Sequence, residues 1–86
     1  MMSASQAAER AVAHVTALTG RSAESVVGLE RADDGGWRVR VEVVETHRIP
    51  DSADILAVYD TEVDADGDLV AYRRARRYPR GRVERD

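Results

Sequence analysis

The sequence predicts an α+β fold in which one N-terminal helix packs on a four-stranded antiparallel sheet. Three observations predict it. Apolar residues recur at helical spacing near the N-terminus, apolar and polar residues alternate farther along the chain, and two tight turns are rich in Asp and Gly. A helix followed by strands that short turns connect gives an antiparallel sheet with the helix across one face. We expect the 86 residues to form a single domain.

The predicted helix covers about residues 3–19. Ser5 and Glu9 suit its first turn, and Gly20 should end it, because glycine enters the left-handed conformation after a helix at little cost. An apolar stripe rich in alanine should let the helix lie close to the sheet. The stripe consists of Ala8, Ala11, Val12, Val15 and Leu18.

Four strands follow from the alternation and the turns. They cover about residues 25–31, 37–46, 55–63 and 69–78, and residues 79–86 are expected to form a loose tail. Pro50 should interrupt pairing between the second and third strands, because proline lacks a backbone donor. One face of the sheet should be charged. The residues expected on it are Arg38, Arg40, Glu42, Asp60, Glu62, Arg74 and Arg76.

The composition restricts what the protein can do. The chain contains no Cys and no Phe, and it has one Trp and three Tyr. Disulfide and thiol chemistry are therefore excluded, and a thin aliphatic core leaves little stability for a deep pocket with several buried polar groups. No apolar run is long enough to span a membrane and no signal pattern opens the chain, so we expect a cytoplasmic protein.

Charge is distributed unevenly along the chain. Twelve carboxylates and four arginines lie between Glu30 and Asp68, whereas seven arginines and two carboxylates lie between Leu69 and Asp86. A basic edge that meets an acidic surface, in this chain or in a partner protein, accounts for this pattern. The alternative is a small nucleic-acid-binding module, in which the Arg-rich C-terminal strand grips phosphates and its tyrosines stack on bases.

Neither a catalytic residue nor a metal or cofactor site is expected. The acidic turn at residues 64–68 resembles the start of a calcium loop, but it continues into a strand and lacks the later ligands and flanking helices. His14 lies at the flank of the helical stripe and suits a boundary position. His47 lies in a polar connection without a nucleophile or metal to accompany it, so we expect no enzyme activity.

The segment from Trp37 to Asp60, WRVRVEVVETHRIPDSADILAVYD, resembles the signature of the gas vesicle protein O (GvpO) family. The continuation DADGDLVAYRRARRYPRG is similar to the final hairpin of that family and to its Y-x-R-x-x-R-Y-x-R ending. The resemblance implies a non-catalytic accessory protein for gas vesicle formation that contacts other accessory proteins and the shell protein. Many members carry a long, charged N-terminal extension that these 86 residues do not include.

The resemblance and the charge pattern together suggest a protein-contact surface near the connection between the second and third strands and along the last strand. A second interpretation is that these charges satisfy one another within the sheet. An exposed edge strand also offers a route to a homodimer. The candidate contact residues are Glu42, Glu45, Arg48, Pro50, Asp54, Tyr59, Tyr72, Arg74, Arg77, Tyr78 and Arg80, and Leu56 falls on a further recurring position of the family.

Overall fold

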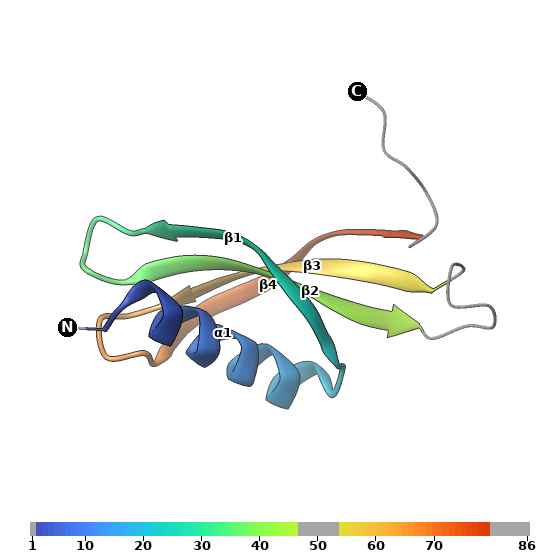
Figure 1. Ribbon diagram of the computed structural model, residues 1–86, viewed down its shortest axis with the longest axis horizontal. Coiled ribbons are helices and arrows are strands. Elements are labelled where there is room, and N and C mark those ends of the chain that lie inside the picture. The colour runs from blue at the N-terminus through green and yellow to red at the C-terminus, as the bar shows by residue number, and fades with distance from the viewer. Residues whose placement is uncertain (1, 47–53, 80–86) are drawn as a thin grey trace, which may run out of the picture.

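The predicted α+β architecture is confirmed. The computed structural model describes residues 2–46 and 54–79. Within them, one helix lies across one face of a four-stranded antiparallel sheet, whose strands follow one another in chain order (Figure 1). The elements are α1 (Ala4–Thr19), β1 (Ala23–Arg31), β2 (Trp37–Thr46), β3 (Ile55–Val63) and β4 (Leu69–Pro79).

The start of α1 lies where the sequence predicted it, with Ser5 in the first turn. The cap is Ser3: the Ser3 Oγ accepts a hydrogen bond from the Gln6 backbone at 3.2 Å, and the Gln6 side chain accepts one from the Ser3 backbone at 2.9 Å. This reciprocal pair satisfies two donors that a helix start leaves open. Gly20 ends the helix as predicted, with φ of +70° and its N–H bonded to the Thr16 carbonyl.

The core lies between α1 and the central strands. The buried helix residues are Ala7, Ala11 and Val15, spaced four apart, so the apolar stripe is rotated from the prediction, and Leu18 is exposed. Alanine lets the helix backbone approach the sheet closely. The sheet contributes Trp37, Val39, Val41, Val43, Ala57 and Val63 to this core.

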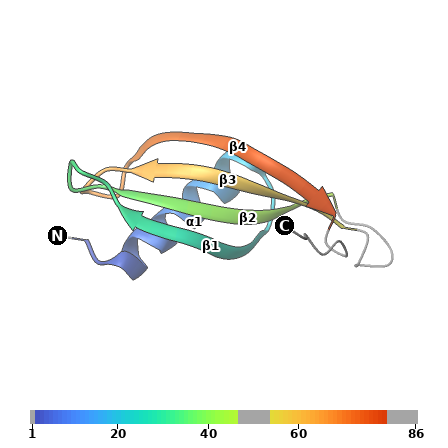
Figure 2. The ribbon, with the colours of Figure 1, turned by 90° about the horizontal axis from the view of Figure 1, so that it is seen from above.

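Strand pairing defines two faces of the sheet. The helix-side face carries the core residues, and the other face, which we call the open face, is covered by no described helix or strand (Figure 2). The prediction that Arg74 belongs to the charged open face is wrong. Arg76 pairs with Val58 but Arg74 pairs with Tyr59, so Ala75 is an extra residue in β4. Such a bulge moves the following side chains to the opposite face, and Arg74 therefore joins the helix side.

The two hairpin turns lie close to each other and to the first half of α1. A Cβ atom on Gly36 would lie 2.3 Å from the Val63 carbonyl oxygen, so only glycine fits this approach of two backbones. The His14 side chain hydrogen-bonds through Nε2 to the Gly67 carbonyl oxygen at 3.0 Å. His14 is half-buried, as the sequence predicted for a boundary residue. None of the helices formed by the described residues could span a membrane.

Candidate functional site

The predicted contact residues extend along β2, β3 and β4 from the end of the sheet where β2 finishes and β3 begins. Arg48, Pro50 and Arg80 lie outside the described residues. The other eight are described, and strand pairing divides them between the two faces of the sheet. Five of these lie on or beside the helix-side face, namely Glu45, Tyr59, Tyr72, Arg74 and Arg77.

Glu45 is the centre of the helix-side group. Its carboxylate is buried, and its two oxygens have separate partners: Oε2 lies 2.9 Å from Arg74 Nη1, and Oε1 lies 3.2 Å from Arg77 Nε. The Arg21 guanidinium also donates a hydrogen bond to the Glu45 backbone carbonyl. Charge-assisted bonds of this kind are stronger than neutral ones and offset the cost of removing the carboxylate from water.

The strand pairing around this group is irregular at two places. In β2, Val44 pairs with Leu56 and Thr46 pairs with Ile55, so Glu45 is an extra residue, but simple alternation from the core residue Val43 already places it on the helix side. Arg74 reaches the helix side only because of the bulge at Ala75 in β4, since without it alternation from Arg77 would turn Arg74 toward the open face.

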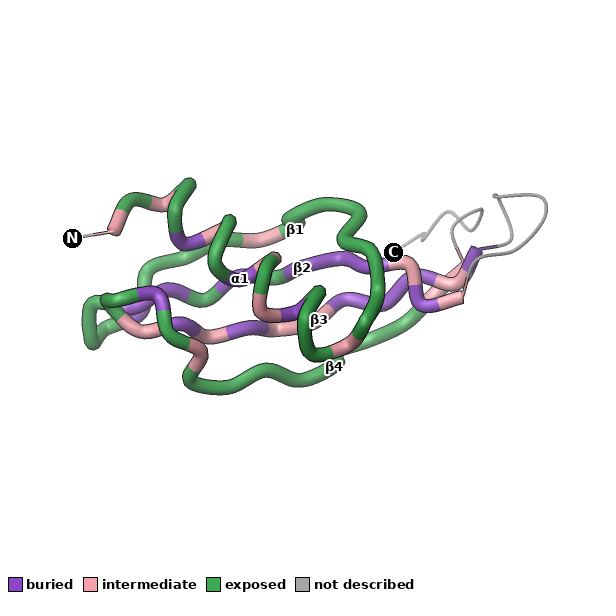
Figure 3. The backbone as a smooth tube through the Cα atoms, turned by 90° about the horizontal axis from the view of Figure 1, so that it is seen from below, coloured by how far each residue is buried: buried purple, intermediate pink, exposed green. Residues whose placement is uncertain are grey.

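Two tyrosine rings extend the group along β3 and β4. The centroids of Tyr59 and Tyr72 are 6.0 Å apart with the rings tilted by 32°, and Tyr72 is 39% exposed. The helix packs on β1, β2 and β3 and touches β4 least, so this part of the sheet stays accessible (Figure 3). We call the residues Tyr59, Tyr72, Arg74 and Arg77 the Tyr–Arg strip.

The other predicted residues lie elsewhere. On the open face, the Tyr78 hydroxyl hydrogen-bonds to the Glu42 carboxylate, and the Arg76 guanidinium lies 5.4 Å from the Tyr78 ring centroid. Both Glu42 and Asp54 are buried, Asp54 completely. The sequence grouped these residues with the Tyr–Arg strip through the family resemblance, although simple alternation turns Tyr78 away from Arg77 and Glu42 away from Glu45.

These contacts bear on the two interpretations of the charges at the candidate contact residues. Glu42 and Glu45 both have partners within the fold, as expected if the charges satisfy one another. The side chains of Arg74 and Arg77 are nevertheless 48% and 55% exposed. An arginine has five N–H donors, so each guanidinium can pair with Glu45 and still present donors to another molecule.

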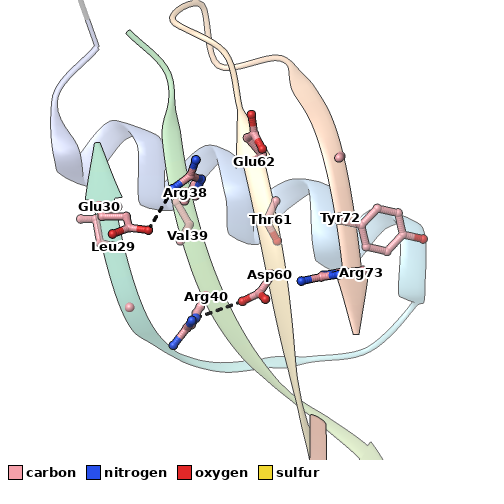
Figure 4. Close-up of a pocket in the computed structure, with 12 residues that line it drawn as sticks. Leu29, Glu30, Arg38, Val39, Arg40, Asp60, Thr61, Glu62, Tyr72 and Arg73 are labelled. Atoms are coloured by element: carbon pink, nitrogen blue, oxygen red, sulfur yellow. Dashed lines mark hydrogen bonds and ion pairs between the residues drawn. The ribbon is translucent and has the colours of Figure 1, made fainter. Parts of the chain in front are cut away.

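No pattern in the sequence predicts a hollow in the open face. A groove of about 460 Å³ crosses all four strands there (Figure 4). Its charged lining consists of Glu30, Arg38, Arg40, Asp60, Glu62 and Arg73. Two ion pairs cross it, Arg40 Nε with Asp60 Oδ1 at 3.0 Å and Arg38 Nη1 with Glu30 Oε1 at 3.4 Å.

Chemistry-bearing groups are sparse in the described part of the chain. Among residues 2–46 and 54–79, no three His, Asp or Glu side chains are grouped so that they could hold a metal ion. His14 is engaged with a turn carbonyl, and His47 lies outside the described residues. The described arrangement can form ion pairs, donate hydrogen bonds and stack aromatic rings.

Comparisons with known proteins agree with the resemblance found in the sequence. The family model described as gas vesicle synthesis protein GvpO matches residues 1–84. Gas vesicle protein O of a Streptomyces species is 52% identical over 75 residues, which are 87% of this chain and 58% of that protein. Gas vesicle protein O of Haloferax mediterranei is 36% identical over 63 residues, which are 73% of this chain and 45% of that protein.

Gas vesicle protein O1 of Halobacterium salinarum is 40% identical over 55 residues, which are 64% of this chain and 46% of that protein. The chain thus spans about half the length of the curated relatives it matches. No solved structure matches it.

Proposed function

Because the chain belongs to the family of the gas vesicle synthesis protein GvpO, we propose that it takes part in gas vesicle formation as a non-catalytic accessory protein. It acts by binding other gas vesicle proteins, among them accessory proteins and the shell protein, in the cytoplasm where the vesicles form. Its binding surface is the Tyr–Arg strip. The names of its relatives support a role in gas vesicle formation, and the geometry of the strip supports the binding of partner proteins.

One observation carries the choice of surface. Two half-exposed guanidiniums are held on one buried carboxylate beside two tyrosine rings, on a part of the sheet that α1 leaves accessible. Arginine and tyrosine are enriched where protein interfaces concentrate their binding energy. The buried Glu45 holds the guanidiniums in place before a partner arrives, which reduces the entropy lost on binding. Two arginines on one carboxylate leave an excess of positive charge, so a partner surface with carboxylates fits best.

The distribution of arginines disfavours the nucleic-acid alternative. Arg74 and Arg77 lie on the helix side and share Glu45, whereas Arg73 and Arg76 pair with open-face positions. A nucleic-acid backbone needs cations along one continuous track. Here the four arginines of β4 are divided between two faces.

Co-purification with matched variants tests the proposal. The variant Glu45→Gln/Arg74→Gln/Arg77→Gln removes the charges together, so no carboxylate is left buried alone. The control Glu9→Gln/Arg10→Gln/Arg31→Gln makes the same change in net charge at exposed positions outside both the strip and the groove of the open face. Tagged chains are expressed with a gas vesicle gene cluster that lacks its own copy, and partners and vesicles are counted. We expect the first variant to lose partner capture and vesicles, and the control to retain both.

Retention of partners by a folded strip variant would exclude the Tyr–Arg strip as the binding surface. Folding is checked by the fluorescence of Trp37, the one tryptophan of the chain, which is buried against the helix. A gel shift of random single-stranded oligonucleotides that weakens steeply with salt would instead favour nucleic-acid binding.

A further inference from the structure

Around the groove, the charges of the open face alternate in sign from one strand to the next. Strand pairing places the residues around the groove in two rows across the sheet. One row is Gly28, Arg40, Asp60 and Arg73, and the other is Glu30, Arg38, Glu62 and Ala71. By strand, β1 contributes an anion, β2 two cations, β3 two anions and β4 a cation.

Counted from β4 to β1 instead of from β1 to β4, the charges have the opposite sign at every strand, so one copy of the face is complementary to a second copy turned around. A twofold axis parallel to the strands, between β2 and β3, brings β2 of one copy opposite β3 of another, and β1 opposite β4. Each charged strand then faces a strand of opposite sign. Twofold interfaces use the same patch on both subunits and must be self-complementary in this way.

We propose that the open face is a self-association surface, on which a second copy of this chain packs face to face with β2 opposite β3. At its centre, Arg38 and Arg40 of each copy meet Asp60 and Glu62 of the other. This interface lies on the opposite face from the Tyr–Arg strip and does not depend on the proposed function.

The twist of sheets leaves this pairing intact. Packed sheets keep their strand directions within about 30° of each other, and neighbouring strands lie about 4.8 Å apart. The two charged rows are two residues apart, so each lies about 3.4 Å from their midpoint. A rotation of about 30° then displaces a side chain by about 2 Å, which is less than half the strand spacing. Opposite charges therefore stay opposite.

The shape of the open face also suits a second copy. The side chains of Arg38 and Arg40 are 58% and 67% exposed, so they project from the sheet. The groove of about 460 Å³ that they border gives room for the corresponding side chains of another copy. Each arginine keeps its present partner, Glu30 or Asp60, and gains an anion from the second copy, which gives alternating charge networks.

Edge strands offer a less regular surface for the homodimer expected from the sequence. The pairing of β1 is irregular at two places, and so is that of β4. Bulges of this kind bend an edge and interrupt its hydrogen-bonding groups, which hinders the addition of another strand. By comparison, the alternating charges around the groove extend across all four strands of the open face.

A charge-exchange experiment tests the proposal on the full chain. The variant Arg38→Glu/Arg40→Glu makes β2 and β3 both anionic, and Asp60→Arg/Glu62→Arg makes both cationic. Sedimentation equilibrium at low salt is measured for the wild type, each variant and their equimolar mixture. We expect the wild type to dimerise, each variant to associate at least tenfold more weakly, and the mixture to form a heterodimer. Added NaCl should weaken the wild-type dimer, because exposed charges are screened.

Three outcomes would overturn the proposal. One is a wild type that stays monomeric at every concentration, and another is a pair of variants that dimerise as well as the wild type, as an edge-strand dimer would. The third is a mixture of folded variants that forms no heterodimer. Trp37 fluorescence reports folding of each variant. If a double variant unfolds, Arg40→Asp and Asp60→Arg apply the same exchange with one substitution in each chain.

Discussion

Two ion-paired carboxylates in this small sheet illustrate how burial changes the effect of a salt bridge on stability. Glu45 is buried on the helix side and its two oxygens pair with two arginines. Asp60 lies on the open face with its side chain 32% exposed, and it pairs with an arginine that is 67% exposed. The distances are alike, 2.9 and 3.0 Å. The two pairs differ in what happens when the arginine is removed. The carboxylate of Glu45 is then left buried without a partner, whereas that of Asp60 can be solvated by water.

Removing both partners of Glu45 should give the largest effect. The variant Arg74→Met/Arg77→Met leaves a carboxylate in a buried position, and losing the partners of a buried charge costs about 3–5 kcal/mol. We expect the midpoint of urea unfolding, followed by Trp37 fluorescence, to fall accordingly. Combining it with Glu45→Gln should recover part of the loss. If the double variant were as stable as the wild type, Glu45 would not be buried in solution.

Glu45→Gln alone should have an intermediate effect. The amide keeps the volume of the side chain but weakens both charge-assisted hydrogen bonds, while the arginines can turn to water. We expect a loss of about 1–2 kcal/mol in the same unfolding measurement. A loss of stability as large as that of the double variant would mean that the loss comes from the arginines left without a carboxylate, rather than from the carboxylate left without arginines.

Breaking the exposed pair should change stability much less. For Arg40→Gln or Asp60→Asn we expect a loss of at most about 1 kcal/mol, reduced further by screening because the arginine is mostly exposed. Urea titrations at low and high salt, at a chain concentration too dilute for dimers, would measure this. The contrast with Glu45 fails if Asp60→Asn unfolds the chain.

Thr61 gives the smallest predicted effect and extends the comparison to an uncharged group. It is 2% exposed, and its Oγ1 makes no hydrogen bond with the described residues. Replacement by the similarly shaped valine removes an unpaired hydroxyl, so Thr61→Val should be neutral or slightly stabilising. Thermal unfolding detects the change. A clear loss of stability would reveal a partner for the hydroxyl.

Local patterns predicted most of the fold. The strands over residues 37–46 and 55–63 have the predicted bounds, and Gly20 ends the helix. The capping box of Ser3 and Gln6 was not predicted, because only the exact position of the first turn decides which side chain reaches the open N–H groups. The first strand starts at Ala23, two residues before its predicted start, and there it pairs with Val43 of β2.

The members of the candidate site come from the sequence, and their arrangement comes from the structure. The sequence identified Glu45, Arg74 and Arg77 through their resemblance to the family, and it also identified Tyr78 and Glu42. It placed Arg74 on the wrong face, since an alternation of polar residues continues unchanged through a bulge. The hollow in the open face was missed, because the curvature of a sheet depends on how all of its strands twist together.

The sequence by itself determined the helix, the strands, the turns and the family, because periodicity, glycine positions and motif residues are local properties of the chain. Only the tertiary structure decided which charges are buried and which face each one occupies. Strand pairing, with its bulges, joins residues about thirty positions apart, such as Glu45 and Arg74. The interaction energy of such an ion pair depends on how much water the folded sheet excludes from it.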